Sequence, residues 1–182
     1  MFLSTAATAI ALLASTVAAI PASLTSMAEN PNLEITELVI NSTANGNTML
    51  QFNVQNPEPL AANGIAECRG EWDTTKQDWP ISGEALTCDN STSMTWYIDS
   101  WTSAMNFVIN IQDRFDDPSV GKPPYDRMTT FSKAIINETV VSYASDTPAG
   151  NTNAGTDAPP ESISGSQLPD ITIYAVVYAV SA

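Results

Sequence analysis

Short stretches in which apolar and polar residues alternate run through most of the chain and predict β-strands. Residues 33–40 (LEITELVI) are rich in β-branched and aliphatic side chains, and their alternation changes phase near Glu37, which predicts a β-bulge. Residues 49–54 alternate without interruption. Because the Asn45-Gly46 pair between these stretches favours a tight turn, we expect a β-hairpin here.

Two further strands are predicted at residues 65–72 and 85–88, and a sharper alternation follows them. Residues 94–98 and 105–111 each place their apolar side chains on one face, which predicts a half-buried hairpin around a turn at residues 100–103. The apolar face comprises Met94, Trp96 and Ile98 in the first strand and Met105, Phe107, Ile109 and Ile111 in the second, with Asn106 and Asn110 on the opposite face.

Prolines interrupt the pattern after this hairpin. Residues 113–125 contain three prolines and predict a long, turn-rich loop. Residues 127–136 are compatible with either a short helix or a strand, and the sequence does not decide between them. Residues 138–144 (ETVVSYA) predict another strand.

The C-terminal part of the chain changes character twice. Residues 145–170 contain four prolines, three glycines and four acids without a base, so they bury too little apolar surface to offset their ordering entropy and predict a flexible loop. Residues 171–180 (ITIYAVVYAV) are apolar on both faces, as expected of a strand in the middle of a sheet. The alternative interpretation is the tail of a lipid-anchor signal, although about ten residues are few for that role.

The N-terminal segment has the pattern of a peptide that is removed during export. Residues 1–20 carry no charge, and their apolar run is too short to span a bilayer and ends at small residues before Pro21. We interpret residues 1–19 as a secretory signal peptide with cleavage after Ala18 or Ala19, and expect a secreted, extracellular protein. The alternative is a buried N-terminal helix, but such a helix normally has a polar face.

Two other features agree with secretion. Asn41, Asn90 and Asn137 begin Asn-x-Ser/Thr triplets in polar stretches and are candidate N-glycosylation sites. Cys68 and Cys88 are the two cysteines of the chain, and an oxidising compartment favours a disulfide between them over a metal pair or a reactive thiol. Closing a loop of about 20 residues would stabilise the fold by roughly 3 kcal/mol.

These patterns together predict an all-β fold, a single-domain antiparallel β-barrel or sandwich with one disulfide. The expected core covers residues 20–144, and the acidic loop covers residues 145–170. A C-terminal strand within residues 171–182 then completes the domain. An apolar content of 43% agrees with a domain that buries a substantial core.

The charge of the chain limits its partners. Six Lys and Arg residues against 20 Asp and Glu residues give a formal net charge of −14. Phosphate contacts need a basic surface, so nucleic-acid binding is excluded, and attachment of the processed protein to a membrane is disfavoured. We attribute the acidity to solubility in an acidic exterior.

The chain contains no histidine, which removes Ser-His-Asp and Cys-His hydrolases, His-dependent nucleases and His-based metal sites. Among carboxylate pairs, Glu67 with Glu71 and Asp116 with Asp117 are candidates for glycosidase chemistry, but a role as solvated surface residues is simpler for each. We therefore assign no catalytic residue, cofactor or metal. A calcium site is the alternative for the aspartates around the long loop, Asp113, Asp116, Asp117 and Asp126.

Residues 67–111 contain both cysteines and all four tryptophans. Trp72, Trp79 and Trp101 are candidate ligand-facing aromatics, since amphipathic rings suit stacking on sugars. Trp79 precedes Pro80 in a turn and is the one most expected to be exposed. Trp96 shares one face of its strand with Met94 and Ile98 and is expected in the core.

The order of cysteines and aromatic residues resembles that of the secreted fungal family typified by the Alternaria major allergen, over roughly residues 34–143. The resemblance implies a small β-barrel, often dimeric, that acts as an allergen or as an effector engaging plant defence proteins of the thaumatin-like type. This chain lacks the second disulfide usual in that family, and its acidic loop and final strand have no counterpart there. The residues that carry the resemblance are Cys68, Trp72, Trp79, Cys88, Trp96, Tyr97, Phe107, Phe115, Asp116, Asp117 and Pro118.

Two functions from different classes follow. The first is a secreted, non-enzymatic interaction protein, effector- or allergen-like, that engages host extracellular proteins through loops such as 73–79 and 113–125. The second is a cell-wall carbohydrate-binding module or a weak carboxylate-dependent glycosidase, with tryptophans beside a groove. We prefer the first, because no set of residues forms a convincing catalyst.

Overall fold

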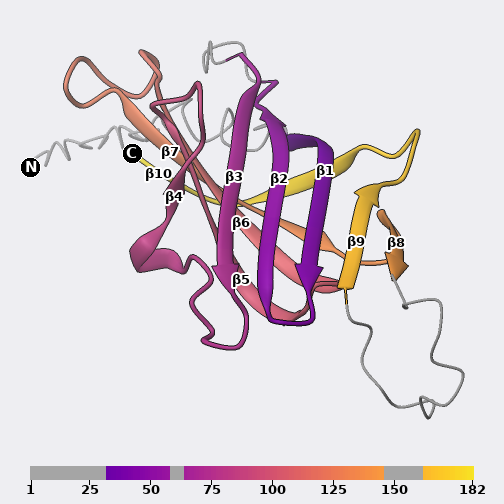
Figure 1. Cartoon of the computed structure of the whole chain (residues 1–182). Coiled ribbons are helices and arrows are strands. Elements are labelled where there is room, and N and C mark those ends of the chain that lie inside the picture. Colours follow the sequence, from indigo (N-terminus) through magenta and orange to yellow (C-terminus); the bar gives the residue numbers. More distant parts are fainter. Residues whose placement is uncertain (1–31, 58–63, 146–161) are drawn as a thin grey trace, which may run out of the picture.

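The computed structural model describes residues 32–57, 64–145 and 162–182, which form a single all-β domain (Figure 1). The predicted signal peptide at residues 1–19 lies outside these ranges. No helix within them has the length and apolar character needed to cross a membrane. The strands are β1 (Leu33–Thr43), β2 (Asn47–Gln55), β3 (Ala66–Asp73), β4 (Leu86–Thr87), β5 (Met94–Ser103), β6 (Asn106–Asp116), β7 (Arg127–Ile136), β8 (Val141–Ser145), β9 (Ser162–Gln167) and β10 (Ile173–Ser181), with a 3-10 turn, η3 (Ser82–Glu84), before β4.

Eight of these strands follow one another in an antiparallel sheet, in the order β3-β2-β1-β10-β7-β6-β5-β4. The two ends of the sheet meet where Glu67 of β3 bridges Asp89, just after β4, so the sheet is a nearly closed barrel. The disulfide between Cys68 and Cys88 crosses the same seam. The predicted all-β fold and the predicted disulfide are therefore confirmed, and the barrel is the architecture found.

The predicted N-terminal hairpin is present, and its bulge gives β1 two different neighbours. Gly46 in the turn has a φ of 87°, and a Cβ there would lie 2.5 Å from Thr75 Cγ2, so this position requires glycine. Glu37 has a φ of 54°, and the β1–β2 register shifts between Thr36 and Val39, as the change of phase predicted. Before the bulge β1 pairs with β10, and after it β1 pairs with β9.

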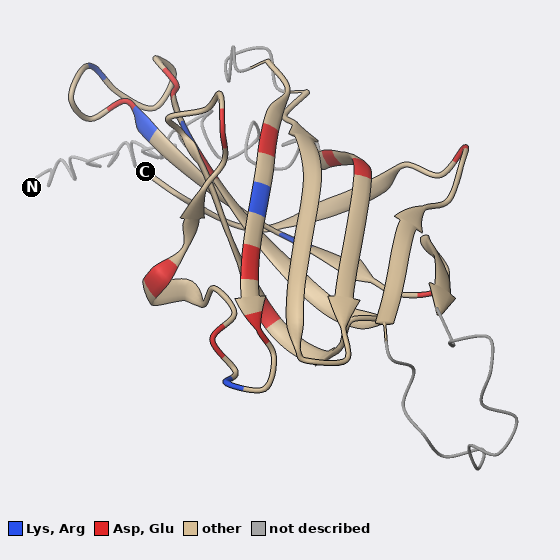
Figure 2. Ribbon diagram, viewed as in Figure 1, with Lys and Arg blue, Asp and Glu red and all other residues tan. Residues whose placement is uncertain are grey.

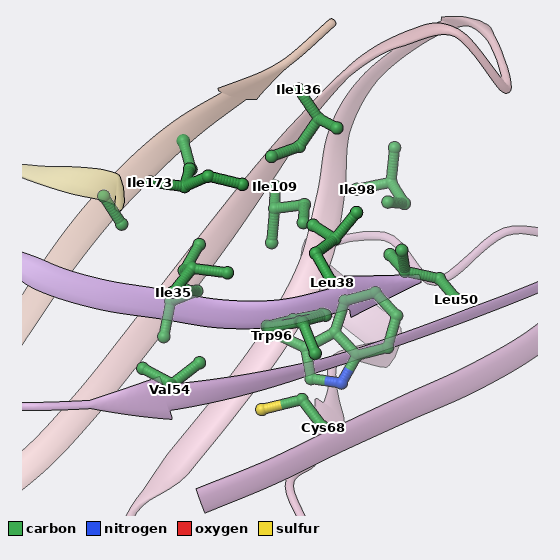
Figure 3. Close-up of a cluster of buried hydrophobic side chains, with 14 of the residues drawn as sticks. Ile35, Leu38, Leu50, Val54, Cys68, Trp96, Ile98, Ile109, Ile136 and Ile173 are labelled. Carbon is green, nitrogen blue, oxygen red and sulfur yellow. The ribbon is translucent and has the colours of Figure 1, made fainter. Parts of the chain in front are cut away.

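Apolar side chains from the whole barrel fill its interior (Figure 3). Trp96 is fully buried and meets Phe52 edge-on, with 5.2 Å between the ring centroids. Gly70 on β3 leaves the space that Trp96 occupies, because a Cβ there would lie 2.8 Å from Trp96 Cζ2. The largest fully buried side chains are Trp96, Phe52, Phe107, Leu33, Ile35, Leu38, Ile40, Leu50, Met94, Ile109, Ile111 and Ile136.

The second predicted hairpin is present as β5 and β6, with three corrections. Met105 lies in the turn and is exposed, because β5 extends through the residues predicted as the turn. Asn110 is on the outer side of β6, as predicted, but other side chains bury it fully. Asp113 belongs to β6 rather than to a loop, and its buried carboxylate accepts hydrogen bonds from Asn56 Nδ2 at 2.6 Å and Ser93 Oγ at 2.9 Å.

Two segments after β6 also differ from their predictions. Residues 127–136, for which the sequence left helix and strand open, form β7. The prediction of a flexible loop at residues 145–170 is wrong for β9, which pairs with β1 on one side and β8 on the other. Backbone pairing holds this polar strand, so its lack of apolar residues misled the sequence argument. Residues 146–161 lie outside the described residues.

The C-terminal apolar stretch forms β10, which lies between β1 and β7 as predicted for a strand inside the sheet. Its inner side chains, Ile173 and Ala175, are buried in the core. Its outer side chains are uncovered, whereas the continuous apolar pattern predicts burial on both faces. The outer face of β10 therefore becomes the most unusual part of the surface.

Candidate interaction surface

The outer side of β10 and the neighbouring β7 exposes a continuous group of large apolar side chains. Tyr174, Val176 and Tyr178 on β10 are 53%, 54% and 52% exposed, and Ile135 on β7 is 62% exposed. The register, in which Val176 lies opposite Lys133, places Tyr174 beside Ile135. We call Tyr174, Val176, Tyr178 and Ile135 the β10 face. Scattered apolar residues are common on protein surfaces, whereas a contiguous group of this kind is a candidate interaction site.

The ring of Tyr178 in this face is held by contacts from β6 and β7. The Nδ2 of Asn110 on β6 donates a hydrogen bond of 2.7 Å to the hydroxyl of Tyr178. The Nζ of Lys133 on β7 lies 5.0 Å from the centroid of the Tyr178 ring, in a cation–π contact. Phe131, also on β7, contacts the same ring with 6.4 Å between centroids. These contacts restrict the Tyr178 side chain, and a side chain that is already restricted loses less entropy in a contact.

Tyr97 and Asp99 of β5 complete the polar support beneath Tyr178. Burial, together with the neighbouring Tyr178 and Asp99, raises the pKa of the Tyr97 hydroxyl to about 12. Lys133 donates a hydrogen bond of 2.9 Å to the Asp99 carboxylate, and this bond raises the pKa of Lys133. At neutral pH the group therefore contains a neutral phenol and one internally paired cation.

The β10 face carries almost no net charge, in contrast to the chain as a whole. β10 contains no charged residue, and β7 contains Arg127 and Lys133 but no acid (Figure 2). Lys133 is already paired with Asp99. In a chain with a formal net charge of −14, this stretch stands out as apolar and close to neutral. Aromatic residues with few charges are typical of the centres of protein–protein interfaces.

The predicted ligand-facing tryptophans lie elsewhere and pack on one another. Trp72 meets Trp101 edge-on at 5.5 Å, Trp79 stacks on Trp101 at 5.9 Å, and Trp101 contacts Phe107 at 5.3 Å. Trp72 is 4% exposed, so its assignment as a ligand-facing residue is wrong. Trp79 and Trp101 are half-buried. These contacts make the tryptophans part of the apolar core rather than a row of exposed platforms for sugar rings.

Two hollows in the described surface also lack the features of a carbohydrate site. One, of about 450 Å³, lies beside the proline-containing loop, and the other, of about 220 Å³, lies over β1, β8 and β9. Neither is lined by a tryptophan or by an Asp or Glu side chain. The lining residues are Pro124, Tyr125, Arg127, Thr129, Ser181 and Ala182 in the first, and Val39, Asn41, Ser142, Ala144, Ser164, Gly165 and Ser166 in the second.

The candidate carboxylate pairs lie in ordinary structural surroundings. Glu67 and Glu71 are four residues apart on β3, so their Cα atoms are about 13 Å apart along the strand, and both side chains are exposed. Glu71 is also paired with Arg69 at 2.6 Å. Asp116 lies 3.9 Å from Arg127, and Asp117 accepts a hydrogen bond from the Ser119 backbone. Each carboxylate therefore has a simple structural environment.

The aspartates proposed as a calcium site do not come together. Asp113 is buried in β6, whereas Asp116 is exposed at the end of the same strand. The backbone of Asp126 accepts a hydrogen bond from the amide of Asp117 at 2.7 Å, which closes the base of the long loop. Among the residues that the structure describes, no three acidic, cysteine or histidine side chains form a group able to hold a metal ion.

The three candidate glycosylation sites differ in their surroundings. Asn90 is exposed in a turn and has a φ of 58°. Asn137 follows β7, and its Oδ1 accepts hydrogen bonds from the backbone amide and the hydroxyl of Thr139. Asn41 lies within β1 rather than in a turn, with its side chain half-exposed. Glycosylation at these positions stays a prediction.

The two predicted binding loops are largely polar. In the first, Asp73 accepts hydrogen bonds from Thr75 and pairs with Lys76, contacts that lower the pKa of Asp73 to about 2. In the second, Tyr125 is the most exposed of the large apolar residues. Sequence reasoning missed the β10 face, although an uncharged apolar run in a strongly acidic chain was the available signal.

Comparisons of the chain with known families, with curated proteins and with solved structures gave no significant match.

Proposed function

We propose that this protein is a secreted, non-enzymatic interaction protein that engages an extracellular host protein through the β10 face. The single observation that carries the proposal is the row of exposed apolar residues on β10 and β7, in a chain that is otherwise strongly acidic. A soluble domain exposes such a row at an energetic cost unless a partner covers it. Tyr and aliphatic side chains on a rigid sheet are the composition expected at the centre of such an interface.

The resemblance to the Alternaria major-allergen family supports a fungal, effector- or allergen-like role for this interaction. The small barrel with one disulfide fits that resemblance. The binding surface proposed here differs from the loops expected from the sequence. The β10 face exposes four large apolar side chains and holds one of them, Tyr178, by a hydrogen bond, whereas Asp73 in the loop after β3 is engaged in polar contacts.

A binding experiment with matched variants tests this proposal. The glycosylated, secreted protein is immobilised and exposed to plant apoplastic fluid and, in parallel, to insoluble cell-wall polysaccharide. Ile135→Ser alters the β10 face, while Ile81→Ser alters an isoleucine of similar exposure that lies outside it. Both positions are exposed, so we expect stability changes within about 0.5 kcal/mol.

The proposal predicts that a plant protein is retained by the wild type and by Ile81→Ser, and is lost with Ile135→Ser. Retention that is unchanged by Ile135→Ser would place the binding site elsewhere. Retention on polysaccharide that falls with Trp79→Ala would instead favour the carbohydrate-binding function, for which no contact in the described structure gives specific support.

A further inference from the structure

Two carboxylates of β1 lie along one edge of the β10 face. Glu34 on β1 is paired in register with Tyr174, so its side chain lies on the same outer side. Within the described chain Glu34 forms no ion pair. Glu37, further along β1, is exposed and accepts one hydrogen bond from Asn53 Nδ2. The apolar centre thus has an acidic edge on the β1 side.

The chain offers few free cations that could neutralise this edge. Of the six basic residues in the sequence, four already have a carboxylate partner in the described structure. Lys133 on β7, next to the β10 face, is directed away from β1 and pairs with Asp99 on β5. Glu34 therefore lies beside an apolar surface without a basic partner in the described structure. The four paired basic residues are Arg69, Lys76, Arg127 and Lys133.

A second copy of the chain is a poor occupant of this surface. Each copy has a formal net charge of −14, and each would bring its own Glu34 to the contact, while Lys133, the basic residue nearest the face, is already paired with Asp99. Burying carboxylates without a counter-charge is costly, and like charges across an interface oppose association. The homodimer implied by the family resemblance is thus less compatible with this face than a partner of opposite charge.

We propose that the β10 face binds a cationic protein, whose apolar side chains cover Tyr174, Val176 and Tyr178 and whose Lys or Arg side chain pairs with Glu34. This inference rests on the proposed function and adds the charge of the partner. The apolar centre supplies the affinity, and the acidic edge selects the partner. The negative charge of the whole chain also accelerates the encounter with a cationic surface.

A display experiment identifies the chemistry that this surface selects. Random peptides of about 15 residues, displayed on yeast, are sorted against the full-length secreted protein, and binders are re-sorted against the variants. Glu34→Gln removes the edge carboxylate, and Glu84→Gln removes an exposed carboxylate in η3, away from the face. Ile135→Ser and Tyr174→Ser disrupt the apolar centre, with Ile81→Ser and Tyr125→Ser as exposed controls.

The inference predicts enriched peptides with more Lys and Arg than the unsorted library. Their binding should weaken at least about fivefold with Ile135→Ser or Tyr174→Ser, and about threefold with Glu34→Gln. Glu84→Gln should leave it unchanged. Raising the salt from about 50 mM to about 500 mM should weaken binding to the wild type more than to Glu34→Gln.

Other outcomes separate this inference from the proposed function. Peptides that need Ile135 and Tyr174 but show no excess of Lys and Arg would overturn the cationic partner and leave the interaction surface intact. Peptides whose binding is unchanged by Ile135→Ser and by Tyr174→Ser would count against the surface itself. So would a sort in which the wild type enriches no more binders than the Ile135→Ser protein does. Concentration-dependent self-association that is lost in Tyr174→Ser would identify the occupant as a second copy and overturn the inference.

Discussion

Asn110 and Tyr178 are joined by a hydrogen bond that passes across β7, in which the Asn110 Nδ2 donates to the Tyr178 hydroxyl at 2.7 Å. The two residues are 68 positions apart in the sequence. The bond ties an exposed ring of the last strand to a fully buried amide in the middle of the sheet. It holds the ring of Tyr178 in one defined arrangement on the solvent-facing side of β10.

Replacing Tyr178 by Phe should therefore destabilise the fold, because the buried amide of Asn110 would lose its acceptor. We expect a decrease of about 1 kcal/mol in the free energy of unfolding, measured by chemical denaturation. Tyr174→Phe is the matched control, since the Tyr174 hydroxyl makes no hydrogen bond within the described chain. A Tyr174→Phe effect as large as that of Tyr178→Phe would contradict the role assigned to the bond.

Gly70→Ala should disturb the centre of the core. The added Cβ would lie 2.8 Å from Trp96 Cζ2, and the fully buried indole has little room to move. Overpacking of this kind costs about 1–3 kcal/mol of stability. Thermal or denaturant unfolding measures the effect, and Gly83→Ala, where a Cβ would meet nothing within 4 Å, controls for the loss of glycine flexibility.

Removing the disulfide should weaken the seam of the barrel. Cys68 and Cys88 join β3 to the residue after β4, where the backbone bridge between Glu67 and Asp89 also links the two ends of the sheet. For a separation of 20 residues, the Cys68→Ala/Cys88→Ala protein should lose roughly 3 kcal/mol in the free energy of unfolding. An unchanged denaturation midpoint would show that the seam holds without it.

Tyr97 gives the stability of the protein an alkaline limit. Its pKa in the folded protein is raised to about 12, whereas an unfolded tyrosine ionises near 10. The folded state favours the protonated phenol, so this contribution is complete below about pH 10 and is lost as the pH rises towards 12. Tyr97→Phe should flatten the fall in the free energy of unfolding over this interval, measured by urea titration at several pH values. An unchanged slope would mean that Tyr97 ionises alike in both states.

The parts of the fold that local patterns encode could be predicted from the sequence. The hairpin with its bulge at Glu37 follows from alternation and from the Asn45-Gly46 pair, which fix register and turn within a few residues. Cys68 and Cys88 could be paired because no other cysteine competes. Such features depend little on distant parts of the chain.

The parts that depend on distant contacts could not be predicted. β9 is polar and owes its existence to pairing with β1 and β8. Asp113 is buried in a strand because Asn56 and Ser93 supply hydrogen bonds from other segments. For the candidate site, the sequence reveals that β10 is apolar on both sides, but only the three-dimensional arrangement reveals which side lacks a cover.

The measurement that tests the central claim most directly uses the plant protein that the wild type retains from apoplastic fluid. After purification, its affinity for the wild type, Ile135→Ser and Ile81→Ser is determined by isothermal titration calorimetry. If the β10 face is the binding surface, Ile135→Ser should raise the dissociation constant at least about fivefold, while Ile81→Ser should leave it unchanged within error. Equal dissociation constants for the three proteins would contradict the account and place the interaction on another surface.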